Sequence, residues 1–287
     1  MKSSLFIPLQ YILPQHLLSR LAGKLANCRI SFIKTGFINW FVNRYKVDMS
    51  EAAEPDTSAY ADFNSFFTRA LREGARPIDP DPAHIICPAD GAISQLGAIE
   101  QDRIFQAKDR SYSLQALLGG DAELAEKFTG GCFATVYLSP RDYHRVHMPF
   151  GGTLRSMTYV PGKLFSVNTM TSEHVDALFA RNERVVCIFD TDAGPMALVL
   201  VGAMIVAGVE TVWANHVCPN NHAQVSTDYQ KNMPPVRLRK GEEMGRFKLG
   251  STVVAVFGPD MVKLDAALTA LAPVRMGQTM GIINTYP

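Results

Sequence analysis

The chain has 287 residues, of which 47% are hydrophobic and 19% are charged. This composition suits a packed globular protein and excludes a disordered chain, a collagen-like chain and a highly charged coiled coil. The net charge is +1, yet residues 1–47 carry seven Lys or Arg and no Asp or Glu, which leaves −6 on the rest of the chain. This asymmetry predicts an N-terminal arm that meets an anionic surface, either a membrane or a nucleic acid.

The cysteines and the first residues bear on the compartment. Five cysteines are scattered along the chain without a CxxC pair, so we expect no disulfide framework and a reducing environment. Pro8 and Pro14 interrupt the first apolar stretch, and no small-residue cleavage site follows it, so a cleavable signal peptide is not expected. Since no stretch approaches the ~20 apolar residues of a spanning helix, we expect a chain that does not cross a membrane.

Two amphipathic helices are predicted within residues 1–47. The first would start near Pro14 and carry leucines on one face, with basic residues beside them. The second would cover residues 30–45, again with apolar side chains at helical spacing. The apolar positions of the two helices are Leu17, Leu18, Leu21, Leu25, Ile33, Phe37, Trp40, Phe41 and Tyr45.

Apolar faces flanked only by positive charge are typical of helices that lie in a membrane interface. A helical hairpin packed on the body of the protein is the alternative. The missing acids favour the interface, because an ordinary solvated helix face usually mixes both signs. A nucleic-acid-binding arm is disfavoured, since the basic residues are spaced among large apolar ones. We therefore expect a membrane surface and no nucleic acid as partner.

The rest of the chain is predicted to be rich in strands. A polar segment with several prolines comes first, with a short helix expected over residues 63–71. Residues 218–235 have the composition of an exposed loop. Since no βαβ alternation or repeat is present, the fold class is predicted as α+β, a mostly antiparallel β core with an N-terminal amphipathic helical region. Runs rich in Val, Ile and Leu predict strands over residues 132–138, 184–189, 197–206 and 252–257.

Residues 139–149 hold two histidines, two arginines, an acid and a tyrosine directly after a predicted strand. With Ser139 as cap and Pro140 at the first position, the segment is predicted to form a single helical turn. His144 and His147 would then share a face, whereas in an extended segment they would point opposite ways. This density of polar side chains at a strand end indicates function.

Other polar positions give weaker signals. Asp90 stands in a Pro-Ala-Asp-Gly turn, where an Asp usually bonds its own backbone. A metal site on the two histidines would need a third ligand, which the sequence does not supply. His216, Cys218 and His222 lie close together, but their spacing matches no zinc motif. We therefore expect no metal.

The tripeptide Gly250-Ser251-Thr252 opens the last predicted strand. It lacks the GxSxG pattern of a hydrolase elbow and the GxxxxGK[ST] pattern of a phosphate-binding loop. Because Gly250 has no side chain, the Ser251 hydroxyl can approach the carbonyl that precedes it.

Leu249-Gly250-Ser251-Thr252 resembles the self-cleavage motif of the phosphatidylserine decarboxylases, pyruvoyl-dependent enzymes that make phosphatidylethanolamine. Further segments resemble the bacterial type of this family and occur in the family's order, from about Leu9 to the C-terminus. The four-residue motif alone is weak, whereas the ordered set is specific. The further segments are residues 88–91, 141–148, 159–162, 165–168 and 179–184.

The resemblance implies an inactive proenzyme that cuts itself between Gly250 and Ser251. The products would be a β chain of residues 1–250 and an α chain of residues 251–287. Ser251 would be the nucleophile, His147 the base, and Asp90 the group that orients the base.

The same resemblance implies that Ser251 becomes a covalent pyruvoyl cofactor. The pyruvoyl carbonyl would form a Schiff base with phosphatidylserine and take up the electron pair as CO2 leaves. His144 would act on the substrate, either at its carboxylate or in reprotonating the carbanion.

The implied organisation is a membrane-associating region of residues 1–47 and a catalytic domain of residues 48–287. Its partners would be phosphatidylserine, an anionic membrane surface and the protein's own α and β chains, as a homodimer of αβ units. The enzyme would be peripheral on the cytoplasmic side of the cell (inner) membrane, where Lys and Arg near anionic lipid gain ~1 kcal/mol each.

Two other classes of protein remain as alternatives. A lipid hydrolase with a Ser-His-Asp triad would use the same three residues and leave the chain intact, so a denaturing gel separates it from a self-cleaving enzyme. A non-catalytic membrane-binding module would need only residues 1–47, and it leaves the polar residues 141–147 without a role.

Overall fold

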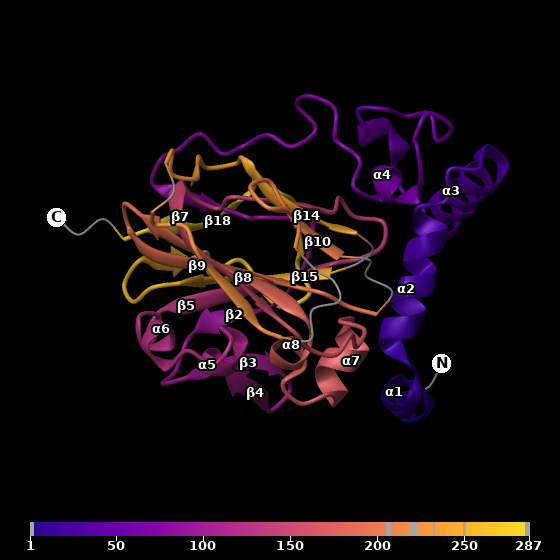
Figure 1. The fold of residues 1–287 in the computed structure, drawn as a ribbon. Coiled ribbons are helices and arrows are strands. Elements are labelled where there is room, and N and C mark those ends of the chain that lie inside the picture. The colour runs from indigo at the N-terminus through magenta and orange to yellow at the C-terminus, as the bar shows by residue number, and fades with distance from the viewer. Residues whose placement is uncertain (1–2, 205–207, 218–222, 232, 249–250, 285–287) are drawn as a thin grey trace.

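The structure is a computed structural model that describes residues 3–204, 208–217, 223–231, 233–248 and 251–284. Figure 1 shows a body of stacked β-sheets, with small helices under it and a column of N-terminal helices along one side. Within the described residues, no helix is both long enough and apolar enough to span a bilayer.

The N-terminal helices are α1 (Ser3–Ile12), α2 (Gln15–Ala26) and α3 (Ser31–Tyr45). The two predicted helices, α2 and α3, are confirmed, and α1 is an additional one. Pro14 lies in the break between α1 and α2, since proline has no N–H with which to continue the first helix. The short helix expected over residues 63–71 is confirmed as α4 (Phe63–Phe67), which begins with a capping box at Asp62 and follows the single 3₁₀ turn η1 (Met49–Glu51).

The aromatic residues of α3 divide between the protein and the solvent. Phe41 is buried and contacts the rings of three phenylalanines from α4, Phe63, Phe66 and Phe67. Trp40 is 54% exposed and Phe32 is 79% exposed. The packed-hairpin alternative therefore holds for the Phe41 side of α3, and the expectation that Phe41 shares a free apolar face with Trp40 is wrong.

The central layer is a nine-stranded antiparallel sheet with the strand order β12-β7-β8-β9-β15-β5-β2-β17, in which β13 also pairs with β7. Long, mostly apolar and buried strands lie at its centre. The strands are β2 (Gly91–Ala98), β5 (Cys132–Leu138), β7 (Gly152–Val160), β8 (Arg184–Thr191), β9 (Gly194–Val201), β12 (Val225–Asp228), β13 (Arg237–Leu238), β15 (Ser251–Phe257) and β17 (Pro273–Val274).

Smaller elements cover both faces of this sheet (Figure 1). One face meets two small sheets, β11-β10-β14-β6 and β1-β18-β16, and the other meets the hairpin β3-β4 and the helices α5–α8. Their bounds are β1 (His84–Ile86), β3 (Arg103–Ala107), β4 (Arg110–Ser113), β6 (Arg145–His147), β10 (Gly208–Thr211), β11 (Asn215–His216), β14 (Glu243–Lys248), β16 (Val262–Leu264), β18 (Thr279–Ile283), α5 (Leu114–Leu117), α6 (Ala122–Glu126), α7 (Thr169–His174) and α8 (Leu178–Arg181).

Strand β15 shows why the central strands read as continuous apolar runs. Val253 and Ala255 pack in the core beneath the two small sheets, whereas Val254 and Val256 pack in the core beneath the helices. Because successive side chains of a strand point to opposite faces, both sets must be apolar. The α+β class with a mostly antiparallel core is thus confirmed.

Two local predictions differ from the structure. Residues 145–147 form strand β6 and not a helical turn, because β14 supplies a pairing partner, with Arg145 opposite Arg246 and His147 opposite Glu243. The predicted loop 218–235 contains strand β12, which pairs with β7 at the edge of the large sheet. Residues 218–222 and 232 of that segment lie outside the described residues.

Candidate active site

Ser251 is the first residue of β15 and lies opposite Leu138 at the end of β5. By strand alternation its side chain belongs to the face of Val253, toward the two small sheets. Ser251 is 1% exposed, and its hydroxyl has no hydrogen-bond partner in the part of the chain that the structure describes. The neighbouring residue of the predicted cleavage site, Gly250, lies outside the described residues.

His147 is held by two hydrogen bonds at the end of β6. Its Nδ1 lies 2.8 Å from the carbonyl oxygen of Gly241, and its Nε2 lies 3.1 Å from the hydroxyl of Tyr143. Since a carbonyl can only accept, Nδ1 carries the proton, and Nε2 accepts from Tyr143. Burial lowers the pKa of His147, against the opposing effects of the Gly241 carbonyl and of the Glu243 carboxylate. The ring is therefore neutral near pH 7, with the lone pair of a general base on Nε2.

Asp90 is bound to groups other than His147. Its carboxylate accepts from Arg76 Nε at 2.8 and 3.0 Å, and from the backbone N–H of Met276 at 2.9 Å. The same guanidinium pairs with Glu51 at 2.7 Å, and the Asp90 bond raises the pKa of Arg76. Asp90 is near His147 through the backbone, because the N–H of His147 donates to the carbonyl of Pro88. The orienting contact on the imidazole comes instead from Gly241.

His144 is fully buried one residue before β6. Its Nδ1 bonds to the carbonyl oxygen of Asp142 at 2.8 Å, and its ring packs on Phe67 with 3.9 Å between ring centroids. Its Nε2 has no partner among the described residues. Burial lowers the pKa of His144 to about 3, so this ring is also neutral. Because the backbone here is extended, the two histidines contact different neighbours and do not share a helical face.

A cleft of about 490 Å³ opens beside these residues. Asp90 and Tyr143 line it, but neither Ser251 nor His144 is among its described lining residues. One wall contributes Arg69, a buried guanidinium whose Nε and Nη1 have no partner in the described part of the chain. Other cationic side chains in the lining are Lys46, Arg76, Arg141 and Arg275. The lining also holds the carboxylates of Asp48, Glu51, Asp90 and Asp142, so the cleft has mixed charge, and Arg69 is the cation in it with unpartnered buried nitrogens among the described residues.

The residues that position His147 and Asp90 could not be identified from the sequence. Tyr143 was noticed only as part of a polar segment, and Gly241 acts through its backbone carbonyl, which no sequence signal marks. The role of Arg76 could not be predicted from the sequence either, because its contact with Asp90 exists only in the folded structure. The residues described include no group of three His, Cys, Asp or Glu side chains that could hold a metal ion. Cys218 and His222 of the rejected zinc reading lie outside the described residues.

A buried serine hydroxyl at the start of a core strand and a neutral, oriented histidine suit the class of enzymes, and comparison with known proteins gives the family. The profile of the phosphatidylserine decarboxylase family matches residues 63–282, and a second profile, named PSD, matches residues 5–46. The chain belongs to the phosphatidylserine decarboxylase family.

Similar proteins carry a common name, phosphatidylserine decarboxylase proenzyme. One from Pseudomonas fluorescens is 61% identical over 283 residues, which covers 98% of both chains. One from Ectopseudomonas mendocina is 62% identical over 282 residues, covering 98% of this chain and 99% of that protein. One from Stutzerimonas stutzeri is 60% identical over 282 residues, covering 98% of this chain and 95% of that protein.

Proposed function

We propose that this chain is a phosphatidylserine decarboxylase that cuts itself between Gly250 and Ser251 and uses the pyruvoyl group made from Ser251. Family membership supports the activity, and the observation that carries the residue assignment is the buried, unpartnered hydroxyl of Ser251. A buried hydroxyl without a partner costs ~1–3 kcal/mol, so its place at the start of a core strand calls for an explanation beyond packing. The proposed role of Ser251 as the nucleophile of self-cleavage would account for it.

Self-cleavage begins with loss of the Ser251 hydroxyl proton to Nε2 of His147. The serine oxygen attacks the carbonyl carbon of Gly250, the C–N bond breaks, and an ester replaces the peptide bond as the proton passes to the serine nitrogen. Elimination then frees the Gly250 carboxylate and leaves a dehydroalanine, which takes up water and releases ammonia. The ends produced are those of residues 1–250 and 251–287.

The positioning of His147 supports its role as the base. The Gly241 carbonyl selects the tautomer in which Nε2 is free of hydrogen, the task that a carboxylate performs in a serine protease triad. The Tyr143 hydroxyl donates to Nε2 of His147, so this hydrogen bond must break before Nε2 can accept the serine proton. Asp90 does not bond the imidazole and would act indirectly. It binds Arg76 and the backbone N–H of Met276 beside the strand that carries His147.

The pyruvoyl group fits the residues around it. It would replace the Ser251 side chain in a site that already excludes water, and the group supplies an electrophilic carbonyl for the substrate amine. The proton of the neutral His144 ring lies on Nδ1, which donates to the Asp142 carbonyl, so Nε2, free among the described residues, is a proton acceptor and would have to take up a proton before it delivers one to the substrate carbon. Arg69 lines the nearby cleft with Nε and Nη1 unpartnered among the described residues, which suits an anionic lipid headgroup.

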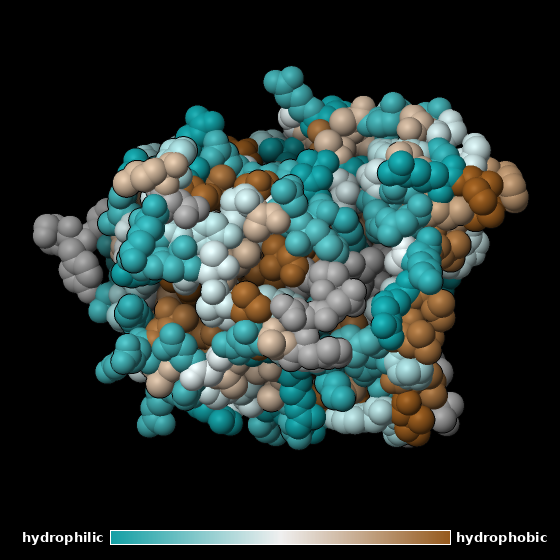
Figure 2. All heavy atoms as spheres, viewed as in Figure 1, coloured by the Kyte–Doolittle hydropathy of each residue, from teal (hydrophilic) through white to brown (hydrophobic). Residues whose placement is uncertain are grey.

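The proposed location is the cytoplasmic side of the cell membrane, with residues 1–47 in the bilayer surface and residues 48–287 as the catalytic domain. Figure 2 shows apolar side chains gathered along the edge formed by α1–α3. Ile12 is 80% exposed there, and the arm carries no acidic side chain. Such a surface fits an anionic bilayer, and a homodimer of αβ units completes the proposed assembly.

The test is release of labelled CO2 from phosphatidylserine by purified protein. Ser251→Ala should abolish it, because the variant has neither the nucleophile nor the precursor of the cofactor. Thr252→Val is the matched control, since Thr252 has a second buried hydroxyl without a partner among the described residues, one position further along β15. Thr252→Val should keep most of the activity. Activity in Ser251→Ala, or equal loss in both variants, contradicts the assignment.

A further inference from the structure

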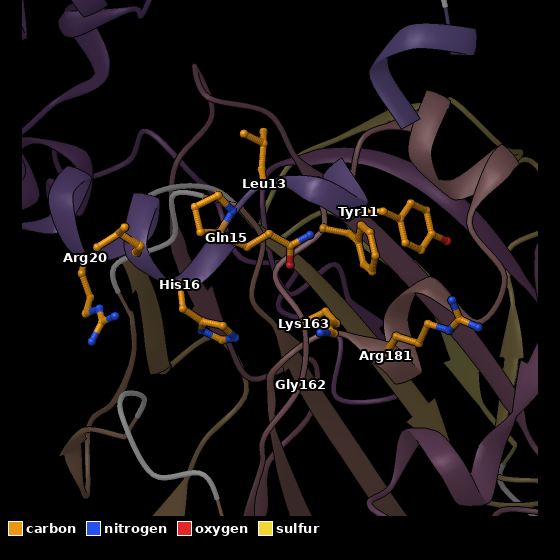
Figure 3. A pocket seen from close by; sticks show the side chains of 11 residues that line it. Tyr11, Leu13, Gln15, His16, Arg20, Gly162, Lys163 and Arg181 are labelled. Carbon is orange, nitrogen blue, oxygen red and sulfur yellow. The ribbon is translucent and has the colours of Figure 1, made fainter. Parts of the chain in front are cut away.

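A pocket away from the processing residues lies where α1 meets α2. Its volume is about 710 Å³, and its walls come from the α1–α2 junction on one side and from residues 162–165 and Arg181 on the other. In Figure 3, His16 and Arg20 extend from α2, and Lys163 and Arg181 extend from the facing segment. The pocket therefore joins the N-terminal arm to the catalytic domain.

Buried glutamines fix the two walls relative to each other. Gln15 Oε1 accepts from the backbone N–H of Leu164 at 2.7 Å, and Gln10 Oε1 accepts from that of Ser166 at 2.8 Å. Gln15 Nε2 also donates to the carbonyl of Gln10 at 2.7 Å, across the break at Pro14. These bonds satisfy backbone groups that would otherwise be buried unpaired, so the junction is a built feature of the fold.

A close backbone approach sets the facing wall. The N–H of Lys163 donates to the carbonyl of Arg181 at 2.9 Å, and a Cβ added at Gly162 would lie 2.4 Å from that oxygen. Glycine is thus required at position 162, because it allows the two backbone segments to approach closely. The side chains of Lys163 and Arg181 therefore start from neighbouring points of the backbone.

The charge of the pocket has one sign. His16 and Arg20 are one turn apart on α2, and with Lys163 and Arg181 they are the titratable side chains at the pocket that can carry positive charge. The described lining contains no acidic side chain. These four side chains are exposed and make no hydrogen bond or ion pair with any described residue. Their charge is available to an anion from outside the chain.

Apolar side chains border the cations. Tyr11, Leu13, Leu17 and Phe165 line the same pocket, and Leu21 continues the exposed apolar face one turn further along α2. Tyr11 and Leu17 are 55% and 47% exposed, with Tyr11 packed edge-on against Phe165. An apolar surface of this kind next to three cations and the imidazole of His16 matches a molecule with an anionic head and an apolar tail.

We propose that this pocket binds the phosphate headgroup of an anionic bilayer phospholipid, separately from the lipid that is decarboxylated. The phosphate lies among His16, Arg20, Lys163 and Arg181, and the acyl chains run along Leu17 and Leu21 into the bilayer. The site deepens the proposed membrane association, on which it rests, by giving it a defined headgroup contact. It would also fix how the catalytic domain faces the membrane, because Lys163 and Arg181 belong to that domain.

The experiment measures calorimetric binding of dihexanoylphosphatidylglycerol, below its micelle concentration, to the full-length protein. The expected result is saturable binding that Lys163→Gln with Arg181→Gln weakens at least tenfold, and that Leu17→Ser weakens at least threefold. The matched control is Lys127→Gln with Lys263→Gln, two exposed cations outside the pocket, which should stay within twofold of wild type. Equal binding by the pocket variant and the wild type overturns the proposal.

Further arms separate the sources of binding. Dihexanoylphosphatidylcholine should bind at least tenfold more weakly, and inorganic phosphate should not compete at equal concentration; equal binding of either overturns an anionic-lipid site. The uncut Ser251→Ala chain should bind the lipid within twofold of wild type, and loss of binding there would place the lipid at the reacting site instead.

Decarboxylation of phosphatidylserine by the wild type is measured in parallel. Lipid binding without decarboxylation leaves this site standing while the proposed function fails, and decarboxylation with unchanged binding in the pocket variant removes this site alone.

Discussion

The catalytic core and the N-terminal arm depart in opposite directions from the usual partition of polar and apolar groups. In the core, the Ser251 hydroxyl and His144 Nε2 are buried without a partner in the described chain. In the arm, Ile12, Phe32 and Trp40 are exposed over more than half of their surface. Each departure costs stability, ~1–3 kcal/mol for a buried unbonded polar atom and roughly 1.5–3 kcal/mol for a large apolar side chain left out of a core. The proposed reaction explains the first departure, and the proposed contact with a bilayer explains the second.

The largest expected effect separates the two histidines of the core. His147→Ala should stop self-cleavage completely, because His147 is the group that we propose accepts the Ser251 proton. His144→Ala should still be cut but should lose turnover of phosphatidylserine, since its role is with the substrate. A denaturing gel and a CO2 assay on both variants check this. If His144→Ala stays uncut while His147→Ala matures, the two roles must be exchanged.

Arg76 tests how strongly the core depends on its buried ion pair. Arg76→Ala leaves Asp90 buried without its charge partner, and we expect a loss of about 3–5 kcal/mol in the free energy of unfolding. Arg72→Ala is the control, because Arg72 is exposed and only bonds the Ser50 carbonyl; its cost should stay within about 0.5 kcal/mol. Urea unfolding in the uncut Ser251→Ala background gives both values. Equal costs for the two arginines would show that the Asp90 pair carries no special weight.

Two neighbouring aromatic residues test the division within the arm. Phe41→Ala should cost about 3–5 kcal/mol of stability, since its ring packs among three phenylalanines. Trp40→Ser with Phe32→Ser should leave stability nearly unchanged and reduce binding to anionic vesicles by about tenfold, also at high salt, because apolar burial is not screened.

Charge in the arm should behave in the opposite way to these aromatic residues. Arg20→Gln with Lys24→Gln should weaken vesicle binding at low salt and have little effect at high salt, where the Debye length falls to ~3 Å. Vesicle co-sedimentation over a salt series measures both pairs of variants. Unchanged sedimentation of Trp40→Ser with Phe32→Ser would show that this side of α3 does not meet lipid.

The smallest effect is a pH dependence of stability from His144. Its pKa is about 3 in the folded chain and ~6.5 in an unfolded one, so between these values the unfolded state binds more protons. Stability from this group is therefore complete above pH 6.5 and falls as the pH drops toward 3, by up to about 2 kcal/mol between pH 6.5 and pH 5. Urea unfolding of the uncut chain at pH 7 and pH 5, with and without His144→Gln, checks this. The same acid loss with and without the histidine would contradict it.

The sequence predicted some of these features and not others for physical reasons. Strands such as β15 were predictable because burial on both faces requires an unbroken apolar run. A turn forms at Ser139, whose carbonyl accepts from the N–H of Asp142, but it does not continue as a helix through His147, because residues 145–147 pair with β14, a partner far along the chain. Helix α1 contains Pro8 and was not predicted; buried Gln10 ties it to the backbone of Ser166, a contact visible only in the fold.

The site shows the same limits of local signals. Asp90, His144, His147 and Ser251 were identified by resemblance to a family, and their roles remain predictions. The Gly241 carbonyl and Arg76, which position two of them, depend on contacts between distant segments. In the arm, the apolar positions expected of the second helix lie in α3, but they combine the covered Phe41 with the exposed Trp40 and leave out Ile38, which is fully buried. The helical spacing of apolar residues defines a face of a helix, but it does not tell whether protein or solvent lies against that face.

The intact mass of the purified wild-type protein under denaturing conditions tests the central claim most directly. The account predicts two chains, residues 1–250 and residues 251–287, with the smaller one lighter than a serine-initiated peptide by the mass of one ammonia. The Ser251→Ala variant should give a single uncut chain. A single chain of residues 1–287 in active wild-type protein, or a small chain with a free amino terminus at Ser251, would contradict it.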